Sequence, residues 1–120
     1  MGRTYTLADL TRSHYLMDGS GRGLWELARW LDESAEAEMA VPLLVQADYH
    51  GHDGYEPQPR RLSAVRVAQD SAKLLAILAE VEPKRRFGGL TAQEWAARFA
   101  EVRDYAAAHS DSVFTSTFFE

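Results

Sequence analysis

The sequence contains no cysteine in its 120 residues. A disulfide framework, a thiolate metal site and a cysteine nucleophile are therefore excluded. Long apolar runs are missing as well, because the longest one, residues 39–45, is too short to cross a bilayer and contains Pro42. The first residues also lack the apolar run of a signal peptide, so we expect a cytoplasmic protein without a membrane partner.

Signatures of catalysis are equally scarce. No serine or threonine lies in a nucleophile elbow, and no histidine belongs to a recognisable relay. Gly19, Gly21 and Gly23 precede a helical pattern, but the lysine and hydroxyl residue of a phosphate-binding loop are absent. The sequence therefore favours a protein that is not an enzyme. It predicts no cofactor apart from the candidate divalent metal described below.

Positive charge is in short supply. The chain has 13 lysines and arginines against 18 acidic residues, a net charge of −5, which argues against binding to nucleic acid. The charges are also segregated, because residues 26–56 carry a net charge of −7 and residues 57–103 a net charge of +4. A solvated acidic stretch is the simplest explanation, and a binding surface for a basic protein partner is the alternative. In that alternative the partner-binding residues are Asp32, Glu33, Glu36, Asp53 and Glu56.

The composition is that of an ordinary globular protein. Apolar residues make up 46% and charged residues 26% of the chain, and its length suits one hydrophobic core. We therefore predict a single domain over residues 1–120.

Two amphipathic helices are predicted in the second half of the chain. Over residues 62–81, polar side chains recur every three to four positions, at Ser63, Arg66, Asp70, Lys73 and Glu80, and this face is expected to point outward. The predicted inward face carries Val65, Ala68, Ala72, Leu75, Leu78 and Ala79, and Leu74 and Val81 widen it.

The second of these helices has a clear start. Thr91 and Glu94 form a capping box, and Trp95, Phe99, Val102 and Ala106 follow as an inward stripe. A further helix is predicted from about residue 24 into residues 33–38, because leucines and alanines recur there at helical spacing.

Three short segments are predicted as strands. They are residues 3–7, 41–47 and 113–119. Residues 8–17 are ambiguous, because apolar residues recur there at helical spacing but Thr11 and Ser13 weaken a helix. The predicted fold is thus α+β, with three or more amphipathic helices packed on a small, mostly antiparallel sheet. Because aromatic residues occupy both faces of residues 113–119, we expect this strand inside a sheet or under a partner, and a homodimer through it is a hypothesis.

The loop after residues 41–47 holds the densest set of metal-binding side chains. Asp48, His50, His52 and Asp53 combine imidazole and carboxylate groups, which suit zinc, manganese or iron. Their spacing matches no established zinc motif, and a polar turn at Asp53-Gly54 explains them without metal. The basic run Lys84-Arg85-Arg86 also has two interpretations. It suits a phosphate or an acidic partner, but it also suits a solvated helix end without a ligand.

The leading functional hypothesis is a small acidic protein-binding module, such as an immunity or antitoxin protein that inhibits a basic partner. The first alternative is a metal-binding protein or metal-dependent enzyme that uses the loop from Asp48 to Asp53. The second is a homo-oligomeric structural protein.

Overall fold

β-branched and aromatic residues start the chain as an antiparallel hairpin, β1 (Thr4–Asp9) and β2 (His14–Ser20). The computed structural model describes residues 4–20, 23, 26, 27, 30 and 60–119. Residues 8–17, which were ambiguous in sequence, belong to the end of β1, a tight turn and the start of β2. The turn contains Ser13 at a positive φ of 53°, and Leu16 is an extra residue that makes a bulge opposite β1.

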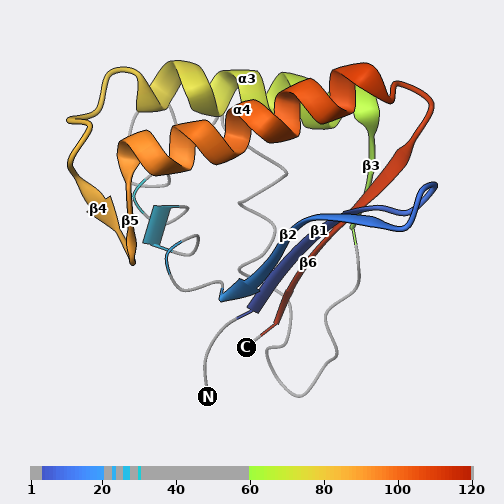
Figure 1. The fold of residues 1–120 in the computed structure, drawn as a ribbon, viewed down its shortest axis with the longest axis horizontal. Coiled ribbons are helices and arrows are strands. Elements are labelled where there is room, and N and C mark those ends of the chain that lie inside the picture. Colours follow the sequence, from blue (N-terminus) through green and yellow to red (C-terminus); the bar gives the residue numbers. More distant parts are fainter. Residues whose placement is uncertain (1–3, 21–22, 24–25, 28–29, 31–59, 120) are drawn as a thin grey trace.

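The sheet is completed by segments distant in sequence. β6 (Val113–Phe119) pairs with β1 on one side and with β3 (Arg60–Ser63) on the other, which gives the antiparallel order β2-β1-β6-β3 (Figure 1). The predicted N-terminal and C-terminal strands are confirmed, whereas residues 41–47 lie outside the described residues. Because β6 is paired on both edges at residues 114–116, it does not offer the open edge that motivated a homodimer. Dimerisation itself stays a prediction.

Two antiparallel helices, α3 (Ala64–Leu78) and α4 (Ala92–Ala108), lie side by side over one face of the sheet (Figure 1). The fold is therefore α+β with an antiparallel sheet, but the prediction of three or more helices is wrong, because the described part contains these two. Gly23, Glu26, Leu27 and Trp30 have helical backbone, and the rest of the third predicted helix lies outside the described residues.

The predicted inward face of α3 is only partly correct: Leu74 and Leu78 are buried as predicted, but other residues lie on the opposite side from the prediction. Val65 is exposed, whereas Asp70, predicted to point outward, is fully buried beside Val67 and Leu74. Burial of Asp70 is possible because its carboxylate pairs with the Arg66 guanidinium, Nε to Oδ1 at 3.1 Å. The other polar residues predicted to point outward are exposed, so the polar spacing misplaced only Asp70.

The prediction for α4 is confirmed. The Glu94 N–H donates to Thr91 Oγ1 at 3.2 Å and the Thr91 N–H donates to Glu94 Oε1 at 3.0 Å, so the capping box is complete. Trp95, Phe99, Val102 and Ala106 are all buried.

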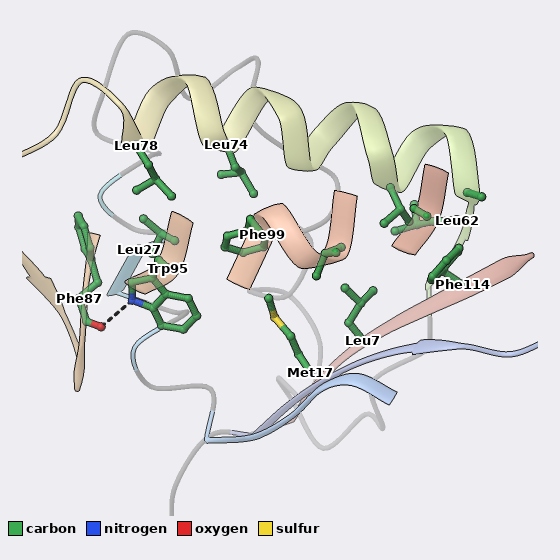
Figure 2. Close-up of a cluster of buried hydrophobic side chains, with 14 of the residues drawn as sticks. Leu7, Met17, Leu27, Leu62, Leu74, Leu78, Phe87, Trp95, Phe99 and Phe114 are labelled. Atoms are coloured by element: carbon green, nitrogen blue, oxygen red, sulfur yellow. Dashed lines mark hydrogen bonds between the residues drawn. The ribbon is translucent and has the colours of Figure 1, made fainter. Parts of the chain in front are cut away.

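One hydrophobic cluster joins the sheet to both helices. Figure 2 shows Leu7 and Met17 of the sheet pointing towards Phe99, with Leu74 above it. At the far side of the cluster, the Trp95 indole N–H donates to the carbonyl of Phe87 at 3.0 Å (Figure 2). Phe87 belongs to a small hairpin of β4 (Arg86–Phe87) and β5 (Leu90–Thr91) that leads into α4.

Candidate functional site

A buried carboxylate organises one end of the molecule. We call this region the turn end and define it as residues 9–15, 61–66 and 105–113. Asp9 Oδ1 accepts the N–H groups of Thr11 and Arg12 at 2.9 and 3.2 Å, which closes the β1–β2 turn. Asp9 Oδ2 accepts the hydroxyls of Tyr105 and Ser112 at 2.7 and 2.8 Å. One carboxylate therefore fastens the turn to the end of α4 and to the loop before β6.

The surroundings of Asp9 fix its charge state. Burial raises the pKa of the carboxyl, but hydrogen bonds from Tyr105, Ser112 and the backbone outweigh burial, so the pKa lies below its ordinary value of 3.8. Burial and the negative charge of Asp9 raise the pKa of the Tyr105 hydroxyl, which stays protonated as a donor. Because four donors occupy the carboxylate, Asp9 is a structural anion and is not poised as a general base.

Two histidines stack on the same tyrosine. The ring of Tyr105 lies 5.0 Å from that of His14 and 4.1 Å from that of His109, measured between centroids. His109 Nδ1 lies 2.9 Å from the Tyr105 carbonyl oxygen, which can only accept, so Nδ1 is the donor in this hydrogen bond. His14 and His109, 95 positions apart in sequence, therefore meet at the turn end. Within the described residues no three histidine or acidic side chains converge as a metal site.

The turn end also carries the exposed apolar residues. Among the described residues, the large apolar side chains with substantial exposure are Leu10 at 45%, Tyr15 at 63%, Val65 at 57% and Val113 at 41%. The Leu10 N–H donates to the Val113 carbonyl at 2.8 Å, and Val113 lies opposite Ser63, two residues before Val65. These four residues thus lie on adjoining segments, and we call them the apolar cluster.

The sheet register explains why Tyr15 faces away from the helices. Leu7, Met17 and Phe114 point towards the helices, so Ala8, between Leu7 and Asp9, points the other way. Tyr15 is paired with Ala8 and shares this outer face. Ala8 itself is buried, so the exposed part of the outer face is its end near the turn.

Arginines border the apolar cluster. The Arg12 guanidinium lies 3.2 Å from an oxygen of Asp111 and also donates to Ser112 Oγ, while Arg66 is paired with Asp70. Arg61 is exposed. The rim of the cluster is therefore polar but largely neutralised by its own carboxylates.

A second distinct surface lies at the opposite end of the helices (Figure 1). We call it the hairpin end and define it as residues 23, 26, 30 and 84–98. Gly88 has a φ of +67°, and a Cβ on it would lie 2.4 Å from the Gly23 Cα, so the backbones of the two glycines are in direct contact. The Gly88 N–H donates to Glu26 Oε2 at 2.6 Å, and the Trp30 and Phe87 rings lie 5.4 Å apart.

None of the site residues predicted from the sequence is among the described residues. The predicted partner-binding residues Asp32, Glu33, Glu36, Asp53 and Glu56 and the predicted metal ligands Asp48, His50, His52 and Asp53 all lie outside them. These assignments stay predictions. In the described ranges no helix is both long and apolar enough to cross a membrane.

The hydrogen bonds that Asp9 accepts from Thr11, Arg12, Tyr105 and Ser112, which we call the Asp9 cluster, were not predicted from the sequence. An aspartate at a strand end followed by Thr11 and Arg12 is a usable signal for a side chain that caps its own turn. Nothing local connects Asp9 to Tyr105 or Ser112, however, because those contacts span about a hundred residues and exist only once the sheet has formed.

Comparison with known proteins adds no relationship: no family model, curated protein or solved structure matches this chain.

Proposed function

We propose that this protein is a small protein-binding module that contacts its partner through the apolar cluster at the turn end. The observation that carries the proposal is the exposure of Leu10, Tyr15, Val65 and Val113 on adjoining segments at the turn end. Exposed tyrosine with aliphatic neighbours and an arginine rim is the composition of protein interfaces, in which tyrosine and arginine supply much of the binding energy.

The Asp9 cluster supports this proposal through rigidity. Leu10 and Tyr15 flank a turn whose backbone N–H groups are held by the Asp9 carboxylate, and Thr11 Oγ1 accepts the Val113 N–H at 3.0 Å. A surface that is already ordered loses less conformational entropy when it binds. The turn is therefore suited to present apolar side chains to a partner in one fixed arrangement.

The acidic stretch of residues 26–56 supplies the second part of the proposal. Its net charge of −7 favours a basic partner, as expected of an immunity or antitoxin protein, and complementary charge speeds association. A cytoplasmic location belongs to the same proposal.

The test compares matched variants in one capture experiment from the native host. The wild type is compared with a Leu10→Ser, Tyr15→Ser variant and with a Gln69→Ser, Ala76→Ser control, whose positions are exposed on α3 and lie outside both the turn end and the hairpin end. A stoichiometric partner should be captured by the wild type and the control. Loss of the Tyr15 side chain alone should weaken binding by about 2 kcal/mol, or roughly thirtyfold, if it is a central contact.

Two outcomes contradict the proposal. Equal capture by the Leu10→Ser, Tyr15→Ser variant would remove the apolar cluster from the interface, and the absence of any stoichiometric partner would remove the binding function. A third variant with Glu33→Lys, Glu36→Lys and Asp53→Lys tests the acidic stretch separately, because a basic partner should be lost from it and also at high salt.

A further inference from the structure

Four cations at the hairpin end form no close ion pair with a carboxylate of the described residues, although Arg86 and Arg98 lie near enough to Glu94 to stabilise its charge. The four are the exposed side chains of Lys84, Arg85, Arg86 and Arg98. Elsewhere in the described ranges, Arg12, Arg66 and Arg103 each form an ion pair with a nearby aspartate. Arg61 and Lys73, by contrast, form no ion pair with a described residue, so four of the six such cations among the described side chains lie at the hairpin end.

Aromatic rings hold two of these arginines in place. The guanidinium carbon of Arg85 lies 5.2 Å from the ring centroids of both Trp30 and Phe87, and that of Arg98 lies 6.0 Å from the ring of Trp95. Stacking restricts the side chain while the in-plane N–H donors of the guanidinium stay available for a carboxylate or phosphate. The hairpin end thus presents partly ordered donors.

The backbone of the hairpin end is not available to an anion. The first N–H groups of α4, at Ala92, Gln93 and Glu94, donate to Arg85 O, Pro83 O and Thr91 Oγ1 at 2.7, 3.1 and 3.2 Å. The Gly88 N–H is occupied by Glu26. Phosphate sites usually rely on free backbone N–H groups at a glycine loop or helix start, so this geometry disfavours a phosphate cradle.

The carboxylates of the region are also committed. Glu26 accepts from Gly88, and Glu94 accepts from the backbone of Thr91 in the capping box. Glu82 is exposed and is the remaining acid close in sequence to Lys84. Any anion bound here would therefore be recognised by side-chain cations alone, which suits several carboxylates spread along a chain.

From these observations we infer that the hairpin end binds an acidic polypeptide segment of a partner protein through Arg85, Arg86 and Arg98. The backbone N–H groups of Gly88 and of the start of α4 are already occupied, which disfavours nucleic acid as the ligand, since its phosphates often bind to such donors. This inference is independent of the proposed function, because the two surfaces lie at opposite ends of the helices (Figure 1).

The test uses octaglutamate peptide as the probe and calorimetry as the readout. The Arg86→Gln, Arg98→Gln variant is compared with a Lys73→Gln, Arg103→Gln control, which removes the same charge at exposed and half-buried helix positions away from the hairpin. The peptide should bind the wild type and the control. It should bind the first variant about five- to tenfold more weakly, as expected for the loss of two exposed charge pairs. Tryptophan fluorescence should change on binding, because Arg85 and Arg98 lie over Trp30 and Trp95.

Each of the other outcomes overturns the inference. Equal weakening in the control would show a response to net charge only, and no binding to the wild type would show no site. Displacement of the peptide by inorganic phosphate at equal concentration would make this a phosphate site. Light scattering of the wild type with and without peptide tests one more possibility. If the wild type is an oligomer and the peptide dissociates it, a second copy of the chain occupies the hairpin end. Circular dichroism of both variants checks that each is folded.

Discussion

A buried carboxylate is stable only when hydrogen-bond donors replace the water that it has lost. At Asp9 these donors come from the β1–β2 turn, from α4 and from the loop before β6, so one side chain joins three parts of the chain. Removing the charge would leave the hydroxyls of Tyr105 and Ser112 without their acceptor. We therefore expect replacement of Asp9 to lower the free energy of unfolding.

Asp9→Asn should lower the free energy of unfolding by about 3 kcal/mol at neutral pH, since hydrogen bonds to a charged group contribute about 1.5–3 kcal/mol and an amide keeps only part of them. Urea denaturation measures the change. Asp111→Asn is the control, because Asp111 is 72% exposed and its surface ion pair with Arg12 should contribute at most about 1 kcal/mol.

The loss caused by Asp9→Asn should depend on pH with a defined sign. The pKa of Asp9 is lowered by folding, so its stabilising effect is present above the ordinary value of 3.8 and is lost as the pH falls through the lower value of the folded state. The difference between wild type and variant should therefore shrink in acid. An unchanged difference at neutral and acidic pH, or an equal loss in the Asp111→Asn control, would contradict this role of Asp9.

At the scale of elements, the β4–β5 hairpin provides two adjacent glycines with different constraints. Gly88 has a φ of +67° and touches the backbone of Gly23, whereas a Cβ on Gly89 would meet no atom within 4 Å. Gly88→Ala should therefore lower the free energy of unfolding by about 1–3 kcal/mol, from the strained φ and the crowding against Gly23.

Gly89→Ala is the matched control for this prediction. It adds the same methyl group one residue away and should change stability by less than about 1 kcal/mol, with a small gain expected from the less flexible unfolded chain. Thermal and urea unfolding of both variants decide the question. Equal effects at Gly88 and Gly89 would show that the contact with Gly23 does not constrain the hairpin.

The two helices show what sequence patterns do and do not encode. The start of α4 was predicted correctly because a capping box is local, with Thr91 and Glu94 only three residues apart. The face of α3 was predicted wrongly at Asp70, which is polar yet buried, because its burial depends on Arg66 and on the helix packed beside it. Patterns within one turn of helix were thus reliable, whereas the choice of face required the tertiary structure.

For the whole molecule, the strands at both ends of the chain were predictable but their order was not. The β propensity of residues 3–7 and 113–119 identified β1 and β6, but nothing in the sequence showed that β6 lies between β1 and β3. The apolar cluster escaped prediction for the same reason, because Leu10 and Val113 become neighbours only through that pairing. The predicted partner-binding and metal-binding residues lie outside the described residues, so their roles stay predictions.

The central position of β6 leads to the last prediction. A chain that ends at Ser112 lacks the strand that pairs with both β1 and β3, and it also lacks Phe114, which is fully buried. Because losing one large aromatic side chain from a core already costs about 3–5 kcal/mol, a substantial part of the stability of a small domain, this shortened chain should not unfold cooperatively. Circular dichroism during thermal and urea unfolding measures this.

Two point variants separate the strand's packing from its exposed contacts. Phe114→Ala should lower the free energy of unfolding by about 3–5 kcal/mol, whereas Val113→Ala, at a 41% exposed position on the same strand, should lower it by about 1 kcal/mol or less. A cooperative transition in the chain ending at Ser112 would show that β6 is dispensable for folding. If instead the shortened chain is unfolded, its mass in solution carries no information about dimerisation, and self-association through β6 has to be tested with folded point variants such as Val113→Ala.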